Sequence, residues 1–406
     1  MYKIIDTPTL PKGFKINGIA CGLKKIKKDL SLIVSDNLCF SAGTYTTNKV
    51  KAAPVIWDKN LTDNKFSTKA LIVNSGNANA CTSTQGENDN QEIAKYLAKH
   101  LDCDEKNILI CSTGVIGVPL EMDTYKKGIA SIVKTIEVSD ENLSNFSNAI
   151  LTTDTFSKIV SVKTVIDNRE VTITGIAKGS GMIHPNMATM LSFIFTDANI
   201  EQQALQNLLG NTIEDTYNMI SIDGDTSTND TVIALASGYA NNDIISETSF
   251  YFKQFQKAFE FVNTFLAKEI VKDGEGASKF IQVDLTGAKT KKDAKNIART
   301  VVSSNLVKCA FFGSDANWGR ILCAMGYSDS YFDTNNVSIS FESDKGTICV
   351  VDKGQPIKFD ENLAKDILLE KTILVKIKLK DGDYSATAWG CDLSYDYVKI
   401  NGDYRS

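Results

Sequence analysis

Short apolar runs alternate with polar and glycine-rich turns along the chain, and this pattern predicts buried strands joined to amphipathic helices. Ala70–Asn74 and Asn107–Cys111 are continuous apolar runs, typical of strands that are buried on both faces. Val171–Ala177 alternates in the manner of a strand, and Met190–Phe195 is strand-like again. Glu92–His100 instead has its apolar residues at helical spacing.

A long amphipathic helix is predicted in the middle of the chain, from about Tyr251 to Val271. Its apolar positions recur at steps of three and four residues, which are Tyr251, Phe252, Phe255, Phe259, Val262, Leu266 and Ile270. We interpret this aromatic stripe as part of a core and not as a cofactor site.

A further series of strands and helices is predicted after a turn at Lys272–Ala277. Strand-like segments are Ile281–Leu285, Val337–Phe341, Ile348–Val351 and Ile373–Leu379. Strands and helices in both halves predict a layered α/β fold in which helices cover the sheets. A domain boundary is expected near residues 280–290.

Composition and charge exclude several classes of protein. With 406 residues, 43% of them hydrophobic and 23% charged, the chain is typical of a soluble globular protein of two or three domains. A net charge of -5 without a block of Lys or Arg argues against binding to nucleic acid or to an anionic membrane. The chain has no apolar run of about 18 residues and no signal-peptide pattern at its start. We therefore expect a cytoplasmic protein.

Histidine and cysteine usage limits the chemistry that the chain can perform. The only histidines are His100 and His184, and no two of the nine cysteines have CxxC spacing. The thiols are therefore expected to be reduced and mostly buried, without a structural zinc site. If the protein is an enzyme, its base is not expected to be histidine, and neither a metal nor a bound cofactor is implied.

The most unusual segment runs from Ala177 to Leu191 and contains Thr189 at the start of an apolar strand. A threonine can act as a nucleophile without histidine if the bond before it is cut, because its own α-amine, with a pKa near ~8, then accepts the hydroxyl proton. The same hydroxyl could make the cut by attacking the Ala188 carbonyl in an N-to-O acyl shift. His184, which Pro185 restrains, is interpreted as structural.

Such a nucleophile also needs hydrogen-bond donors for the developing oxyanion. Ser112–Gly114 is a candidate, because it follows a predicted buried strand and precedes a predicted helix, with Pro119 suited to that helix's first turn. An ordinary strand-to-helix turn is the alternative interpretation.

Asp223–Asp230 looks superficially like a calcium-binding loop. Thr228 stands where that loop needs its turn glycine, and Ala234 stands where it needs the bidentate glutamate. We interpret the segment as a loop that is structural or lies near the active site.

The segment Lys178–Ala198 resembles the self-cleavage segment of the ornithine acetyltransferase family, also called bifunctional glutamate N-acetyltransferases. Further motifs in the order of that family extend the resemblance over nearly the whole chain. They are Pro11–Phe14, Gly22–Lys25, Thr47–Pro54, Asn74–Asn79, Ser112–Gly114, Thr152–Thr155, Asp273–Ala277, Asp315–Arg320, Ala388–Asp392 and Asp396–Asn401.

The resemblance implies a cut between Ala188 and Thr189, which leaves an α chain of residues 1–188 and a β chain of residues 189–406. It implies layered β-sheets sandwiched between helices, with a smaller C-terminal α/β domain at about residues 285–406. It also implies that two copies of each chain assemble into an α2β2 heterotetramer.

The resemblance also implies the roles of particular residues. Thr189 matches the nucleophile that carries the acetyl group, and Thr113 and Gly114 match the oxyanion pair. The positions that bind the amino-acid substrate are Thr152, Lys178, Thr189, Glu275, Asn401 and Ser406. Thr153 fits the pattern at Thr152 equally well, and Ser406 stands where many members have threonine.

The implied reaction is a ping-pong transfer of acetyl from N2-acetylornithine to glutamate, with ornithine and N-acetylglutamate as products in arginine biosynthesis. Some members also accept acetyl-CoA as a donor substrate. Two other functions are open alternatives: a related amidase or aminopeptidase with an N-terminal nucleophile, and a non-catalytic amino-acid-binding protein on the same scaffold.

Overall fold

The computed structural model describes residues 2–184 and 190–403, and these form two compact units. The first unit comprises residues 1–179, 186–213 and 226–266, as far as they are described. The second comprises residues 180–185, 214–225 and 267–406, with the same restriction. The predicted C-terminal segment 285–406 falls within the second unit, which begins earlier.

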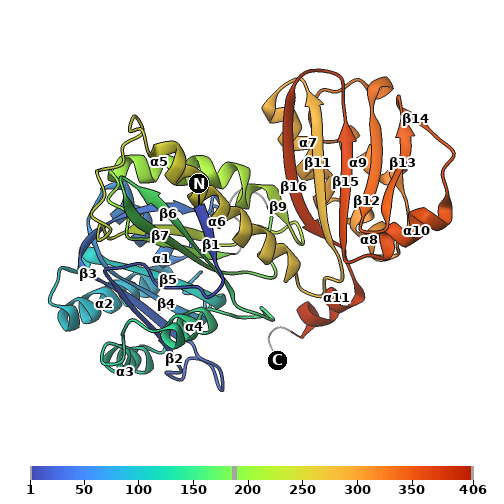
Figure 1. The fold of residues 1–406 in the computed structure, drawn as a ribbon. Helices are drawn as coiled ribbons and strands as arrows, with labels where there is room; N and C mark the ends of the chain where they lie inside the picture. The colour runs from blue at the N-terminus through green and yellow to red at the C-terminus, as the bar shows by residue number, and fades with distance from the viewer. Residues whose placement is uncertain (1, 185–189, 404–406) are drawn as a thin grey trace. The chain divides into compact units, whose positions relative to one another are not determined.

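The first unit contains a nine-stranded mixed sheet in the order β1-β6-β7-β8-β10-β3-β4-β5, with β2 paired to β3 (Figure 1). Its strands are β1 (Tyr2–Ile5), β2 (Phe14–Ile19), β3 (Leu30–Tyr45), β4 (Thr68–Asn77), β5 (Ile108–Val115), β6 (Lys158–Ile166), β7 (Arg169–Lys178), β8 (Leu191–Thr196) and β10 (Thr231–Ala236). The helices are α1 (Ala53–Asp63), α2 (Ser83–Leu101), α3 (Met122–Ile132), α4 (Asp140–Ala149), and most of α5 (Gln202–Asp215) and α6 (Phe252–Lys272).

Strand β3 divides this sheet into two halves that pack against each other. Its first residues pair with β2 and β4, and its last residues pair with β10 after three exposed positions at 36–38. A core lies between the halves and includes Leu71 and Val73 from β4 and Phe193 from β8. The alternating β4 residue Ile72 faces α2 and α3 in a second core.

Helix α6 covers the other half of the sheet. Phe255, Phe259, Val262 and Leu266 are fully buried, which confirms that the aromatic stripe belongs to a core, while Tyr251 is only partly buried. The helix approaches β7 at Gly175, where an added Cβ would lie 2.5 Å from the Val262 side chain. The predicted fold class, sheets layered between helices, is confirmed.

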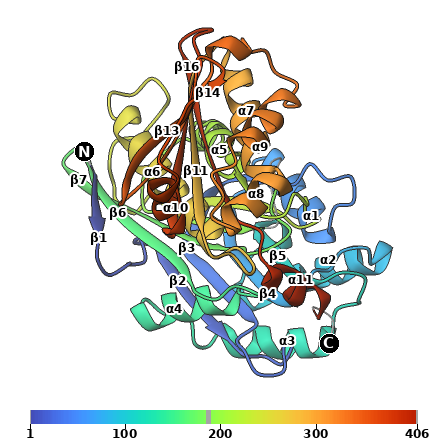
Figure 2. The same cartoon turned by 90° about the vertical axis from the view of Figure 1, so that its right-hand side faces the viewer.

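The second unit is a seven-stranded sheet with helices packed on it (Figure 2). Its strands, in the order β14-β13-β12-β15-β11-β16-β9, are β14 (Gln355–Pro356), β13 (Gly346–Asp352), β12 (Ser338–Ser343), β15 (Thr372–Lys378), β11 (Phe280–Ala288), β16 (Tyr384–Cys391) and β9 (Ile220–Ser221). The helices are α7 (Lys291–Ser303), α8 (Asn305–Phe312), α9 (Trp318–Gly326), α10 (Glu361–Leu369) and α11 (Tyr395–Gly402).

Alternation along these strands separates an apolar face from a polar one. In β11, Val283 and Leu285 are buried, whereas the intervening Asp284 is only partly buried and accepts a hydrogen bond from Thr387 in β16. The apolar face packs against helices; Phe311 of α8, for example, meets Phe341 of β12 edge-on.

Phe146 provides a test of the core between the two halves of the first sheet. Its ring is fully buried and contacts Phe193 and Phe195 edge-on, so Phe146→Ala should lower the free energy of unfolding by about 3–5 kcal/mol. Urea unfolding measures this loss. Phe250→Ala is the control, because Phe250 is 92% exposed, and equal losses in both variants would contradict the assignment.

Candidate active site

The predicted oxyanion residues lie at the ends of two parallel strands. Thr113 and Gly114 belong to β5 and pair with Ser75 and Gly76 of β4. A helix follows Ser112–Gly114, as predicted, but these residues belong to the end of β5 and not to a turn. Helix α3 begins only at Met122, beyond Pro119, because both strands continue through their polar and glycine-containing ends.

Gly114 is required by the closeness of these two backbones. Its φ is +135°, and a Cβ added there would lie 2.3 Å from the carbonyl carbon of Gly76. Any other residue would force β4 and β5 apart. The glycine pair therefore brings the end of β4 against the residues proposed to stabilise an oxyanion.

Lys178 brings two of the predicted residues together. It is the last residue of β7, and its side chain is 4% exposed. Its Nζ donates to Thr152 Oγ1 at 2.9 Å and to Thr113 Oγ1 at 3.4 Å. The structure thus places a buried ammonium between a predicted substrate-binding residue and a predicted oxyanion residue.

A buried carboxylate, Asp154, lies beside this ammonium. Its Oδ2 is 3.8 Å from Lys178 Nζ, and its Oδ1 accepts from Lys158 Nζ at 2.9 Å. The backbone N–H groups of Thr152 and Gly179 donate to the same carboxylate at 3.0 and 2.6 Å. Burial alone would raise the pKa of Asp154, but the two ammonium groups outweigh it and hold that pKa below its usual range.

Lys24 lies near the same cluster. Its Nζ donates to the carbonyl oxygen of Leu151 at 2.9 Å, one residue before Thr152. Burial, together with the positive charges of Lys27 and Lys178, lowers the pKa of Lys24 to about 8, against the opposing effect of Asp29. Sequence analysis did not assign Lys24, Asp154 or Lys158 a role, although Lys24 and Asp154 stand inside motifs that carry the family resemblance.

In the second unit, Glu275 and Asn401 contact each other. Asn401 Nδ2 donates to Glu275 Oε2 at 2.7 Å, and the Glu275 backbone N–H donates to the Ser180 carbonyl at 2.8 Å. An added Cβ at Gly181 would lie 2.3 Å from the Glu275 carboxylate. Gly181 therefore leaves the space that this carboxylate occupies.

Asp223 holds the segment that leads to the predicted cleavage point. Its carboxylate accepts from the backbone N–H groups of Met182 and Ile183 at 2.5 and 2.9 Å. Burial, together with the negative charges of Asp223 and Glu275, raises the pKa of Tyr397 above its usual range. The phenol is thus held neutral, as a hydrogen-bond donor on α11.

His184 contacts a serine and not a carboxylate. Its Nδ1 lies 3.2 Å from Ser221 Oγ, and burial lowers its pKa, as does the charge of Arg299. Ser221 is itself fully buried.

Beyond the predicted cleavage point, Met190 is fixed by a buried side chain. Its backbone N–H donates to Asp230 Oδ1 at 3.1 Å, and burial raises the pKa of this carboxyl well above its usual value. Asp230 ends the loop that superficially resembles a calcium site. Ala188, Thr189 and Ser406 lie outside the described residues, so the nucleophile and the C-terminal binding residue are not located.

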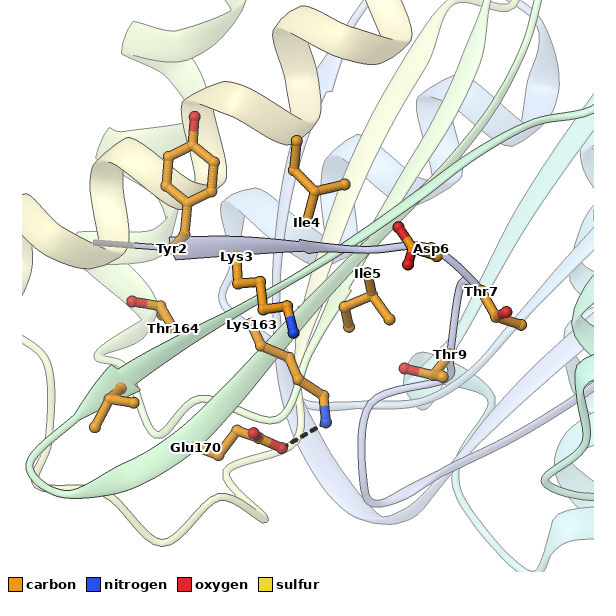
Figure 3. A pocket seen from close by; sticks show the side chains of 11 residues that line it. Tyr2, Lys3, Ile4, Ile5, Asp6, Thr7, Thr9, Lys163, Thr164 and Glu170 are labelled. Atoms are coloured by element: carbon orange, nitrogen blue, oxygen red, sulfur yellow. Dashed lines mark ion pairs between the residues drawn. The ribbon is translucent and has the colours of Figure 1, made fainter.

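A separate cavity of about 690 Å³ lies along the edge strand β1 and contains none of the predicted site residues (Figure 3). It is lined by Tyr2, Lys3, Ile4, Ile5, Asp6, Thr7, Thr9, Lys163, Thr164, Val165 and Glu170. Lys163 and Glu170 form an ion pair of 2.6 Å on its wall. No nucleophile with an adjacent base lies among these residues, so we do not assign catalysis to it.

Neither a metal cluster nor a membrane helix is found in the part of the chain that the structure describes. Within residues 2–184 and 190–403, no group of three or more His, Cys, Asp or Glu side chains could hold a metal ion. No helix in those ranges is long and apolar enough to cross a membrane.

Comparison with known proteins shows the family. The ArgJ family matches residues 15–406, and the arginine biosynthesis bifunctional protein ArgJ of Caldanaerobacter subterraneus is 52% identical over 397 residues, 98% of each chain. The chain belongs to the ArgJ family. This membership confirms the resemblance found in the sequence.

Further members of the ArgJ family support the assignment. ArgJ 1 of Clostridium acetobutylicum is 49% identical over 97% of this chain and 96% of its own. A solved structure, of arginine biosynthesis bifunctional protein ArgJ from Bacillus halodurans, has 42% identity and a TM-score of 0.51. It covers 53% of this chain and 99% of its own.

The ionised state of Asp154 can be tested through stability. Because the pKa of Asp154 is lower in the folded chain than in the unfolded one, its charge stabilises the fold above about pH 4, and this contribution is lost as the pH falls. Lys158→Met should therefore lower the free energy of unfolding by about 3 kcal/mol at neutral pH. The difference in free energy of unfolding between wild type and Lys158→Met should become smaller in acid.

Urea unfolding at a series of pH values measures this difference. Lys163→Met is the matched control, because the exposed pair of Lys163 with Glu170 should contribute about 0–1 kcal/mol. A difference for Lys158→Met that stays constant from neutral to acid pH would show that Asp154 is not the ionised partner.

Proposed function

We propose that this chain is an acetyltransferase of arginine biosynthesis that transfers acetyl from N2-acetylornithine to glutamate through an acetyl-Thr189 ester. The observation that carries the proposal is the contact of the buried Lys178 ammonium with both Thr113 and Thr152, in a member of the ArgJ family. A group suited to bind a carboxylate, at the end of β7, thus contacts a group suited to stabilise an oxyanion, near the end of β5. The relatives' name, arginine biosynthesis bifunctional protein, supports the pathway.

The proposed chemistry uses the amine of Thr189 in place of a histidine. The α-amine takes the proton of the Thr189 hydroxyl, and the oxygen attacks the acetyl carbonyl of N2-acetylornithine. Thr113 and Gly114 donate to the tetrahedral oxyanion. The C–N bond then breaks, the ammonium returns its proton to the leaving nitrogen, and ornithine departs. The amine of glutamate attacks the ester in the same way, which gives N-acetylglutamate and frees Thr189.

Substrate binding is divided among charged and hydroxyl groups. Lys178 binds the α-carboxylate of the amino acid, with Thr152 beside it; Thr153 is the alternative to Thr152. Glu275 accepts from a substrate ammonium, supported by Asn401, which already contacts its carboxylate. Ser406 supplies a hydroxyl at the chain end.

The nucleophile is released by self-cleavage between Ala188 and Thr189. The Thr189 hydroxyl attacks the Ala188 carbonyl, the peptide becomes an ester, and water hydrolyses it to chains of 188 and 218 residues. The Bacillus halodurans chain matches 53% of this chain over 99% of its own length, which is the size of such a fragment and supports a cut near the middle.

Assembly, location and a second donor complete the proposal. The two chains form an α2β2 heterotetramer in the cytoplasm. Acetyl-CoA, which some members of the family that the sequence resembles accept, is a second donor to be tested with glutamate as the acceptor. No bound cofactor is required, because the acetyl group is carried by Thr189 itself.

Intact-mass measurement tests the nucleophile directly. Wild type should give fragments of 188 and 218 residues, and N2-acetylornithine should add about 42 Da to the larger one, since acetyl replaces one hydrogen. Thr189→Ala should remain an uncut chain of 406 residues without transfer, whereas Thr189→Ser keeps a hydroxyl and should still be cut. A cut Thr189→Ala chain would overturn the proposal.

The acceptor of the acetyl group separates transfer from hydrolysis. With N2-acetylornithine and glutamate present, N-acetylglutamate should form at least about tenfold faster than free acetate, because the acetyl-Thr189 ester reacts with the amine of glutamate in preference to water. Both products can be quantified by mass spectrometry in one reaction. A predominance of acetate would favour the amidase or aminopeptidase alternative, and one uncut chain that binds amino acids without turnover would favour the binding protein.

A further inference from the structure

Three charged side chains are buried together at the end of β7. Lys158, Asp154 and Lys178 have side chains that are 0%, 0% and 4% exposed, and the aspartate lies between the two lysines. Antiparallel pairing brings the two lysines to the same end of β6 and β7, since Lys158 of β6 lies opposite Ala177, the residue before Lys178. When all three groups are ionised, the cluster carries a net charge of +1.

We propose that Asp154 is a positioning residue that sets the charge and the position of Lys178 for the carboxylate of the substrate. This inference rests on the proposed function, in which Lys178 binds that carboxylate. Lys178, which contacts the hydroxyls of Thr113 and Thr152, then carries the larger share of the net positive charge of the cluster.

The charge balance follows from the cost of burial. A buried ammonium is unstable without an anionic partner, and two of them within reach of each other would repel, so one would lose its proton. Asp154 at 2.9 Å from Lys158 Nζ and 3.8 Å from Lys178 Nζ offsets this cost for both. The shorter pair is with Lys158, which leaves Lys178 the less neutralised of the two.

Further contacts hold Lys158 beside Asp154. Its Nζ donates to the Phe156 carbonyl at 3.3 Å and lies 4.8 Å from the centre of the Phe156 ring. These contacts fix Lys158 as the partner of Asp154, so the carboxylate is not drawn fully towards Lys178.

Asp154 also ties together the backbone on both sides of the site. It accepts from the N–H of Thr152 in the loop after α4 and from the N–H of Gly179 directly after Lys178. One carboxylate therefore fixes the position of the Thr152 hydroxyl relative to the Lys178 ammonium. A displacement of either would open the 2.9 Å contact between them.

The test compares binding of ornithine with binding of its α-carboxamide, which lacks the carboxylate, by isothermal titration calorimetry on the purified, self-processed protein. Wild type should bind ornithine at least about 30-fold more tightly than the carboxamide, and Asp154→Asn should reduce this preference to less than about threefold. The carboxamide itself should bind wild type and variant within about threefold of each other. A purely structural role would weaken both ligands equally, and that result would overturn the inference.

Asp197→Asn is the matched control in the same unit. Asp197 is also buried and accepts from two backbone N–H groups, those of Lys12 and Thr172, at the far end of β8. The Asp197→Asn variant should prefer ornithine over the carboxamide as strongly as wild type does. Loss of this preference in Asp197→Asn would also overturn the inference.

If Asp154→Asn does not fold, Lys158→Met is measured in the same binding assay. Asp154 would then face Lys178 alone, the pair would be neutral, and the preference for ornithine should again fall to less than about threefold. A wild-type preference in Lys158→Met would overturn the inference. Acetyl transfer is assayed in parallel, so a wild type that shows the predicted binding pattern without transferring acetyl would refute the proposed function and leave the role of Asp154 intact.

Discussion

The buried carboxylate of Asp154 between Lys158 and Lys178 is the interaction on which the candidate site of the first unit depends. Removing three charges from water is costly, and the cost is offset only when the groups pair and their remaining hydrogen-bonding capacity is used. Asp154 meets this condition with two ammonium groups and two backbone N–H groups. The loop after α4 and the end of β7 are therefore held together by electrostatics.

Close backbone approach supplies the second constraint on the site. Gly114 allows β4 and β5 to meet at their ends, and Gly181 leaves room for the Glu275 carboxylate. In both places the absence of a Cβ decides where a polar group lies. This combination of glycine-lined strand ends and a buried ammonium suits acyl transfer, where donors must be fixed before charge develops. It also suits a sequence with only two histidines. His184 contacts the buried Ser221, and His100 lies in the last turn of α2.

Local patterns were sufficient to predict many of the secondary-structure elements. The continuous apolar runs became β4, β5 and β8, and the three- and four-residue spacing from Tyr251 became α6. The ends were harder to predict. The predicted strands Ala70–Asn74 and Asn107–Cys111 both continue further in the structure, because Ser75–Asn77 of β4 pair with Thr113–Val115 of β5. A turn residue remains in a strand when a partner strand satisfies its backbone, and the pattern of one segment does not contain that partner.

The sequence by itself determined the family, the layered α/β class, the exclusion of histidine as the obvious base, and the residues that match the proposed nucleophile and substrate-binding positions. These follow from motifs and periodicities that lie within short stretches of chain. Only the tertiary structure decided that Lys178 contacts Thr113 and Thr152, and that Asp154 and Lys158 accompany it. The physical reason is that the burial and the charge partners of a residue depend on which other parts of the folded chain surround it. Lys178 and Thr113 are 65 positions apart, and only the packing of β7 near β5 makes one of many lysines a buried ammonium with a neighbouring hydroxyl.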